Sequence, residues 1–313
     1  MLSRRHLRVK VMQVLYAHQQ SEDKDLAVAD KALQHSMDRT YDLYITVLSA
    51  LVALYRKAEE KSVISSQKLI PNPQEKKELD AITGNQLLQK LAANLSLRQH
   101  TEKALVDWKD EQELLSSLFK KIMDSTLLGD YIETHTGTFA QDSNFVVEIF
   151  KEFVAPYELL HEFFEEENMY WVSDIPVANT SVLKTLQSFQ EKSDEYHRLL
   201  KLVKDQDDIV FARSLMRKTA LNDKAYNDFI SGKSTNWDSD RIALIDVLLM
   251  KMAICEFLHF SSIPVKVTIN EYIELSKDFS TPKSRGFVNG ILDKLVVDFK
   301  KDGKLKKTGR GLI

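Results

Sequence analysis

The sequence predicts an all-α protein, and three observations carry that prediction. Apolar residues recur at helical spacing along most of the 313-residue chain, a pattern typical of amphipathic helices. The chain holds only 9 Gly and 6 Pro, which favours long helices over a turn-rich β architecture. No β-hairpin or βαβ pattern interrupts the helical stretches. A chain of this length can bury a sizeable core, as one large domain or as two smaller ones.

The expected helices follow the helical spacing from one end of the chain to the other. They cover about residues 4–20, 25–62, 74–98, 100–134, 142–168, 179–204, 207–230, 238–260, 265–279 and 282–301. Segments rich in Pro, Gly, Ser or Thr separate some of them. We expect loops at 70–74, 134–144 and 173–181, and a connector at 231–240.

The first expected helix has an unusual charge pattern. Leu7, Val11 and Leu15 give it an apolar face, and Ser3 can cap its start. Residues 1–20 contain four Lys or Arg side chains and no acidic side chain. Cations at a helix N-terminus oppose the helix dipole, at a cost of a few tenths of a kcal/mol each. We infer that the sequence accepts this penalty in order to hold cations at that end.

The last three helices have recognisable start signals. Asp238 can cap the helix at 238–260, with Trp237 and Ile242 at the positions of a hydrophobic staple. The next helix begins either at Pro264 or at a capping box made by Thr268 and Glu271, and the sequence leaves both open. Thr281 and Pro282 indicate an N-cap followed by the first helical residue of the last helix.

Charge is distributed unevenly over the chain. The net charge is −3, so the protein as a whole does not attract polyanions. Residues 300–313 contain six Lys or Arg side chains and one Asp. The two ends are therefore basic and the body between them is acidic, and such local basic regions can bind polyanions. The basic tail is either a solvated end or an extension of a nucleic-acid path.

The sequence carries no recognisable catalytic, cofactor-binding or metal-binding motif. Phosphate-binding loops, dinucleotide-binding GxGxxG, HExxH and GxSxG patterns are missing. The eight His are scattered, and the single cysteine, Cys255, excludes an internal disulfide and falls in an apolar helical run expected to be core. We therefore expect a binding protein without enzymatic activity, cofactor or metal. Neither a secretory signal nor a membrane span is visible, and we expect a cytoplasmic protein.

Two stretches together resemble a known family. The first is RRHLRVKVMQVLY at 4–16, and the second runs from about 208 to 298 with VTINEYIELSK followed by FVNGILDKL as its most specific part. They resemble the bacterial transcription antitermination factor NusB. The resemblance implies an all-helical fold of two packed bundles. Residues 1–206 would form the N-terminal bundle, with a helical insertion at about 57–206, and residues 207–301 the C-terminal bundle, followed by a basic tail at 302–313.

The resemblance also implies a function and partners. The family binds the boxA element of ribosomal RNA leader transcripts as a heterodimer with NusE, the small-subunit ribosomal protein. That complex joins other Nus factors and RNA polymerase and suppresses premature termination. No membrane takes part.

The same resemblance implies site residues. The expected RNA-binding residues are Arg4, Arg5, Arg8, Lys266 and Phe287, and the expected partner-binding residues are Tyr16 and Asp246. Phe287 could equally be a core residue on the apolar stripe of the last helix. Asp246 lies in an apolar helix, so its carboxylate must reach solvent, an internal cation or a partner.

Two positions depart from the family pattern. His6 stands where many relatives have another arginine, and Lys283 reverses a charge in the loop at 279–284.

Two other classes of protein compete with an RNA-binding antitermination factor. Some ribosomal RNA cytosine methyltransferases carry a NusB-like domain, but they need a glycine-rich cofactor loop and a downstream catalytic cysteine. A helical scaffold that has kept the fold and lost RNA binding would still bind NusE.

Overall fold

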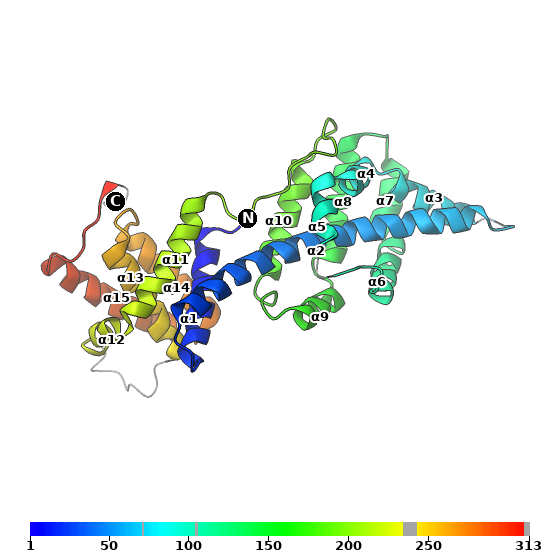
Figure 1. Ribbon diagram of the computed structural model, residues 1–313. Coiled ribbons are helices and arrows are strands. Elements are labelled where there is room, and N and C mark those ends of the chain that lie inside the picture. Colours follow the sequence, from blue (N-terminus) through cyan, green and yellow to red (C-terminus); the bar gives the residue numbers. More distant parts are fainter. Residues whose placement is uncertain (71, 104–105, 234–242, 310–313) are drawn as a thin grey trace. The chain divides into compact units, whose positions relative to one another are not determined.

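A computed structural model describes residues 1–313 except 71, 104–105, 234–242 and 310–313. The described residues form helices and no strand, which confirms the predicted all-α class (Figure 1). The helices are α1 (Arg4–Gln20), α2 (Leu26–Ser66), α3 (Pro73–Thr83), α4 (Gln86–Ala93), α5 (Leu95–Thr101), α6 (Gln112–Met123), α7 (Thr126–Thr134), α8 (Phe139–Ile149), η1 (Phe150–Val154), α9 (Glu158–Glu167), α10 (Ile175–Ser188), α11 (Gln206–Leu221), α12 (Asp223–Ser231), α13 (Leu244–His259), α14 (Val265–Phe279) and α15 (Ser284–Lys301).

Asparagine caps divide one long expected helix into three. The stretch expected as a helix at 74–98 consists of α3, α4 and the start of α5. The Asn85 side chain accepts hydrogen bonds from the backbone N–H groups of Leu87 and Leu88, both at 3.1 Å. The Asn94 side chain accepts one from Leu97 at 2.9 Å. Each amide oxygen satisfies free donors at a new helix start, so the chain can turn there without an unpaired polar group.

Other expected helices also end or break earlier than their apolar spacing suggests. Ser125 caps α7 and Thr138 caps α8, so the expected helices at 100–134 and 142–168 have different bounds. The expected helix at 179–204 begins within the loop expected at 173–181 and ends at Ser188, as α10. Asn222 separates α11 from α12 within 207–230.

The helix starts near the C-terminus settle one open alternative and correct one expectation. The helix α14 begins at Val265 with Pro264 as its N-cap residue, so the Thr268 capping box does not start it. The helix α15 begins at Ser284, two residues after Pro282. The Ser284 hydroxyl accepts from the backbone N–H of Thr281 and also bonds its hydroxyl. The expected signals at Asp238, Trp237 and Ile242 lie outside the described residues.

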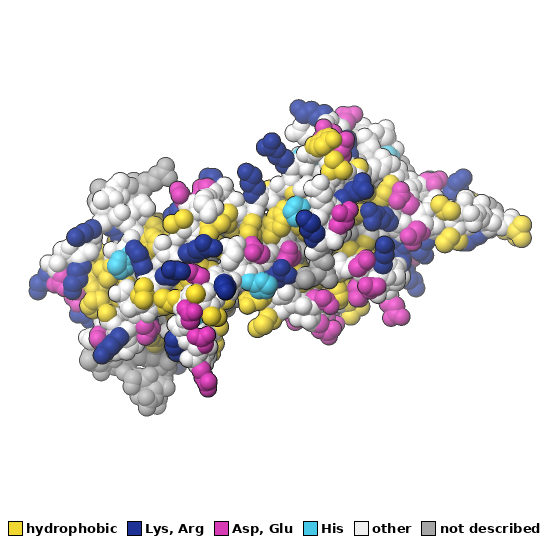
Figure 2. All heavy atoms as spheres, in the orientation of Figure 1, with side chains coloured by type: hydrophobic (Ala, Val, Ile, Leu, Met, Phe, Trp, Pro, Cys, Tyr) yellow, Lys and Arg dark blue, Asp and Glu magenta, His cyan; other side chains and the backbone are white. Residues whose placement is uncertain are grey.

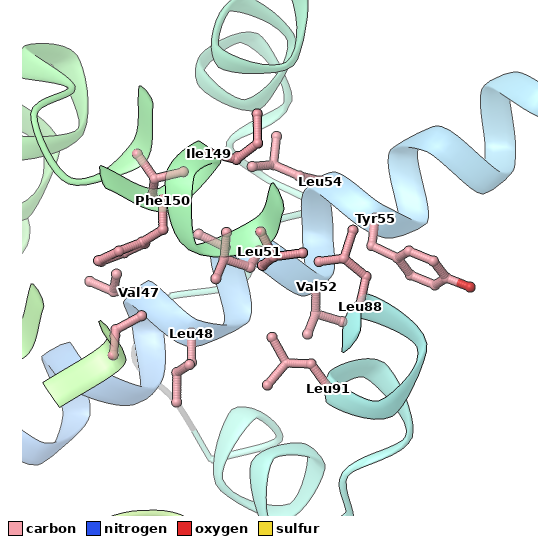
Figure 3. Close-up of a cluster of buried hydrophobic side chains, with 14 of the residues drawn as sticks. Val47, Leu48, Leu51, Val52, Leu54, Tyr55, Leu88, Leu91, Ile149 and Phe150 are labelled. Carbon is pink, nitrogen blue, oxygen red and sulfur yellow. The ribbon is translucent and has the colours of Figure 1, made fainter. Parts of the chain in front are cut away.

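The first of two compact units consists of Met1 and residues 38–202. Its core is built on α2, whose apolar side chains meet those of α4 and of the α8–η1 segment (Figure 3). Leu48, Leu51 and Leu91 are almost completely buried there. Trp108 and Trp171 are also buried, and each indole N–H finds an oxygen acceptor on α2.

The second unit consists of residues 2–37 and 203–313. At its centre lies α13, which is buried over almost its whole circumference, as expected for a helix that is apolar on all sides. The helices α1, α11, α12, α14 and α15 all pack against it. Cys255 is completely buried in this core, in line with the expectation from the sequence.

The bounds of these units differ from those of the expected bundles. The first helix shares a unit with α11–α15, whereas residues 38–202 form a unit of their own. The chain thus leaves the second unit along α2 and returns to it near residue 203. None of the described helices is both long enough and apolar enough to pass through a bilayer.

Candidate nucleic-acid interface

The arginine-rich helix start is built by a capping box. The Ser3 hydroxyl accepts from the His6 backbone N–H, and the His6 ring accepts from the Ser3 backbone N–H at 3.1 Å. The departure from the family pattern at His6 therefore has a local role, because the imidazole takes the place that Glu or Gln occupies in the usual capping box. This cap fixes the first turn of α1, from which Arg4 and Arg5 project.

Carboxylates from other helices offset the unfavourable cations at this helix start. Each of the three arginines meets one: Arg4 pairs with Asp208 of α11, Arg5 with Glu271 of α14, and Arg8 with Glu256 of α13. These partners were not identified from the sequence. An acidic residue inside an apolar helix, as at Glu256, is the one signal that could have indicated a buried cation, since an unpaired buried charge is expensive.

Arg4 is held in place and still half-exposed. Its Nε donates to Asp208 Oδ1 at 3.1 Å, and the guanidinium carbon lies 5.0 Å from the ring centroid of Phe211. The side chain keeps 44% of its surface exposed. An arginine fork has five N–H donors, and this pairing uses one of them, so the rest of the fork is available to an anion.

Arg5 forms a two-pronged ion pair. Its Nε and one terminal nitrogen donate to the two oxygens of Glu271, both at 2.9 Å. The hydrogen bond from Arg5 holds the pKa of Glu271 below its usual range, with the charge of Arg8 adding to the effect. In turn the bond to Glu271 raises the pKa of Arg5. The Arg5 side chain remains 45% exposed, so it too can offer its remaining donors.

Arg8 has a different environment from its neighbours. Only 3% of its side chain is exposed, and it donates to both oxygens of Glu256 at 2.6 and 2.9 Å. Tyr272 and Thr268 also donate to that carboxylate. Burial lowers the pKa of Arg8, but the bonds and charge of Glu256 outweigh it, and the net shift is upward. A guanidinium so enclosed cannot face a strand, so we revise its expected role from RNA contact to positioning α1.

The other two expected RNA contacts also differ in exposure. Lys266 is exposed in the first turn of α14, close in sequence to the Arg5 partner Glu271. Phe287 is buried in α15, so of its two interpretations the geometry favours the core residue. Lys283, the second departure from the family pattern, is exposed and stands as the N-cap residue of α15.

The two expected partner-binding residues lie on separate helices of the second unit. Tyr16 is exposed near the end of α1. Asp246 is buried in the first turn of α13, where its Oδ2 accepts from the Ser284 hydroxyl at 2.6 Å. Its Oδ1 has no hydrogen-bond partner among the residues that the structure describes. A buried oxygen without a donor is costly, and this oxygen is too enclosed for a donor on a partner's surface to reach it.

The surface around these groups is of mixed charge. On the face that Figure 2 shows, Lys and Arg side chains intermix with Asp and Glu over both units. Within the described part of the chain, no three His, Cys, Asp or Glu side chains are arranged to hold a metal ion. Arg4 and Arg5 are thus two half-exposed guanidinium groups at one helix start, each paired with a carboxylate, and Lys266 is exposed on α14.

The comparisons with known proteins agree on one family. A family model described as the NusB family matches residues 174–296. The transcription antitermination protein NusB of Salinibacter ruber is 38% identical over 142 residues, which are 44% of this chain and 89% of that protein. The protein of the same name from Chloroherpeton thalassium is 34% identical over 137 residues, 42% of this chain and 65% of that protein, slightly under two thirds of its length.

A solved structure titled T. maritima NusB is 28% identical, covers 50% of this chain and 89% of its own, and superposes with a TM-score of 0.29. The match to the family model begins at residue 174, within the segment at about 57–206 that the sequence predicts as a helical insertion, and it includes α10.

Proposed function

Because the chain belongs to the NusB family, we propose that it is an RNA-binding transcription antitermination factor. We propose in particular that it binds the boxA element of ribosomal RNA leader transcripts together with NusE, in the cytoplasm and in company with other Nus factors and RNA polymerase. The observation that supports this most is the pair Arg4 and Arg5, each anchored on a carboxylate and each half-exposed at one helix start. The proposed activity is binding and needs no catalytic group.

The chemistry of these side chains suits a single RNA strand. A guanidinium group is planar, permanently charged and able to donate two parallel hydrogen bonds to a phosphate. Anchoring each arginine on a carboxylate reduces the side-chain freedom that binding would otherwise have to restrict. Lys266 supplies a third cation, on α14. Single-stranded RNA binding of this kind weakens with salt, with a slope of about −0.7 per phosphate contact.

The partner NusE is proposed to bind at Tyr16 and near Asp246. Tyr16 offers an exposed aromatic ring, which suits the core of a protein interface. Asp246 is buried in the first turn of α13, so we propose that it supports this face through the Ser284 hydroxyl that it binds, and not by direct contact with the partner.

A gel-shift titration with boxA RNA, with and without NusE, tests the proposal. We expect the R4A/R5A variant to bind boxA RNA about tenfold more weakly per lost arginine, since a charge-assisted hydrogen bond contributes about 1.5–3 kcal/mol. Its salt slope should fall by about 1.4. Arg8 is left in place, because its removal would disturb the fold.

The matched control is K224A/K294A, which also removes two positive charges from the second unit. Lys224 and Lys294 are exposed on α12 and α15. We expect this control to bind boxA RNA as the unaltered chain does. Equal losses in the two variants would contradict the proposed site. Binding of NusE without boxA would instead identify a scaffold that has lost RNA.

A further inference from the structure

A cavity of about 750 Å³ opens beside the two exposed arginines, within the second unit. One side is the start of α1, and the other is the turn before α14 together with the first turns of that helix. It is lined by Ser3, Arg4, Arg5, Arg8, Ser262, Ile263, Pro264, Val267 and Glu271. Its volume lies within the range of cavities that hold small organic ligands, about 300–1,000 Å³.

The two sides of this cavity differ in chemistry. Ile263, Pro264 and Val267 give one side an apolar surface, and Val267 keeps 44% of its surface exposed although it lies on a helix packed into the core. The opposite side holds the half-exposed guanidinium groups of Arg4 and Arg5. A ligand that fits both sides has a flat, largely apolar part joined to an anionic part.

A ribonucleotide has this composition, with a base that has an apolar face and a phosphate that takes arginine forks. Proteins that bind unpaired RNA commonly hold splayed bases against apolar, aromatic or guanidinium surfaces. Resting on the function proposed above, we propose that the cavity holds one unstacked nucleobase of the bound RNA against Val267 and Pro264. Arg4 and Arg5 then bind the phosphates on either side of that nucleotide.

The fixed geometry of the arginines makes this arrangement specific to one nucleotide. Arg5 is tied through two bonds to Glu271, which itself lines the cavity. Arg4 is tied to Asp208 and stacked on Phe211. A sliding strand would draw each guanidinium away from its carboxylate, so the two ion pairs favour one register of the strand. The cavity thus distinguishes a strand that presents a base at that register from a plain polyanion.

The experiment combines a protein variant with altered RNA. Each nucleotide of a boxA oligoribonucleotide is replaced in turn by an abasic one, and affinity is measured for the full chain. We expect one position at which base removal weakens binding about tenfold, the scale of one stacked base. The V267W variant fills the apolar side and should lose about as much affinity for unaltered RNA. When the base at the sensitive position is removed, V267W should lose no further affinity. The salt dependence of its binding should be the same as that of the unaltered chain.

The matched control is V297W, because Val297 is an exposed valine on α15, outside the cavity lining. This variant should bind RNA as the unaltered chain does, and should keep the tenfold loss at the sensitive position. If no single abasic position weakens binding, or if V267W and V297W behave alike, the cavity does not hold a base, although the proposed function is unaffected. A chain that binds no boxA RNA overturns both.

Discussion

At the scale of single residues, three arginines of one short stretch have two kinds of environment. Arg4 and Arg5 are half-exposed, and Arg8 is enclosed with a carboxylate that also accepts from Tyr272 and Thr268. The sequence predicted one group of three cations at this end. It could not separate them, because the partner of Arg8 lies 248 residues away in the chain. Only the packing of α1 on α13 decides which arginine is enclosed.

Removing Arg8 should destabilise the second unit strongly. In R8M the Glu256 carboxylate stays buried without its cation, and breaking a buried pair in this way costs about 3–5 kcal/mol. The free energy of unfolding from urea titration measures this effect. The control R5A removes a half-exposed pair and should cost less than about 1 kcal/mol. Comparable losses in R8M and R5A would contradict the structural role of Arg8.

At the scale of helices, the sequence predicted where helices exist better than where they end. Apolar spacing gave α1, α2 and α14 within a few residues. The same spacing predicted one continuous helix at 74–98 across the breaks at Asn85 and Asn94. Side-chain caps act through hydrogen bonds, which leave the apolar period almost unchanged. The candidate site was likewise predicted only in part. Its cations are evident in the sequence, whereas Asp208 and Glu271 become their partners only after folding.

The C-terminal tail has a structural role that its basic composition did not indicate. The Lys307 ammonium donates to the backbone carbonyls of Glu256 and Phe260 at 3.0 and 2.9 Å, in the last turn of α13. The backbone N–H of Thr308 donates to the carbonyl of Ser261. A lysine in this position donates to carbonyls at the negative end of the helix dipole. The tail is thereby fixed to the turn that leads into α14.

Loss of this lysine cap should weaken the second unit. We expect K307M to lower the free energy of unfolding by roughly 1–2 kcal/mol, since two charge-assisted bonds to a helix end are lost. The neighbouring K306M removes the same charge from an exposed side chain and should change stability by less than about 0.5 kcal/mol. Urea titration of both variants measures the difference. Identical stabilities would show that the tail does not cap α13.

At the scale of the whole molecule, the chain builds two cores from interleaved segments. Residues 38–202 form one compact unit, and the segments on either side of them form the other. The expected boundary at 206/207 follows the order of the sequence, whereas the contacts join the first helix to the last five. Local patterns contain no information on such distant pairing, and the division of the family's bundles between the units remains a prediction.

Two cores of this kind should unfold in two steps. Trp108 and Trp171 are buried in the first unit, so in a W237F background tryptophan fluorescence follows that unit alone, whereas far-ultraviolet circular dichroism follows both. We expect the two signals to give different urea midpoints, which a two-state transition does not. The R8M substitution should move only the transition that fluorescence does not follow. Coincident curves would mean that the units unfold together.

The buried Cys255 gives the chain an internal reporter. It is the single cysteine, it has no exposed surface, and burial raises the pKa of its thiol to about 12. The thiolate is the reactive form. While α13 is packed, alkylating reagents cannot reach the sulfur, and the thiol remains protonated. Modification of this sulfur therefore requires the second unit to open. The rate of modification, followed as a gain in the mass of the protein, measures how often that opening occurs.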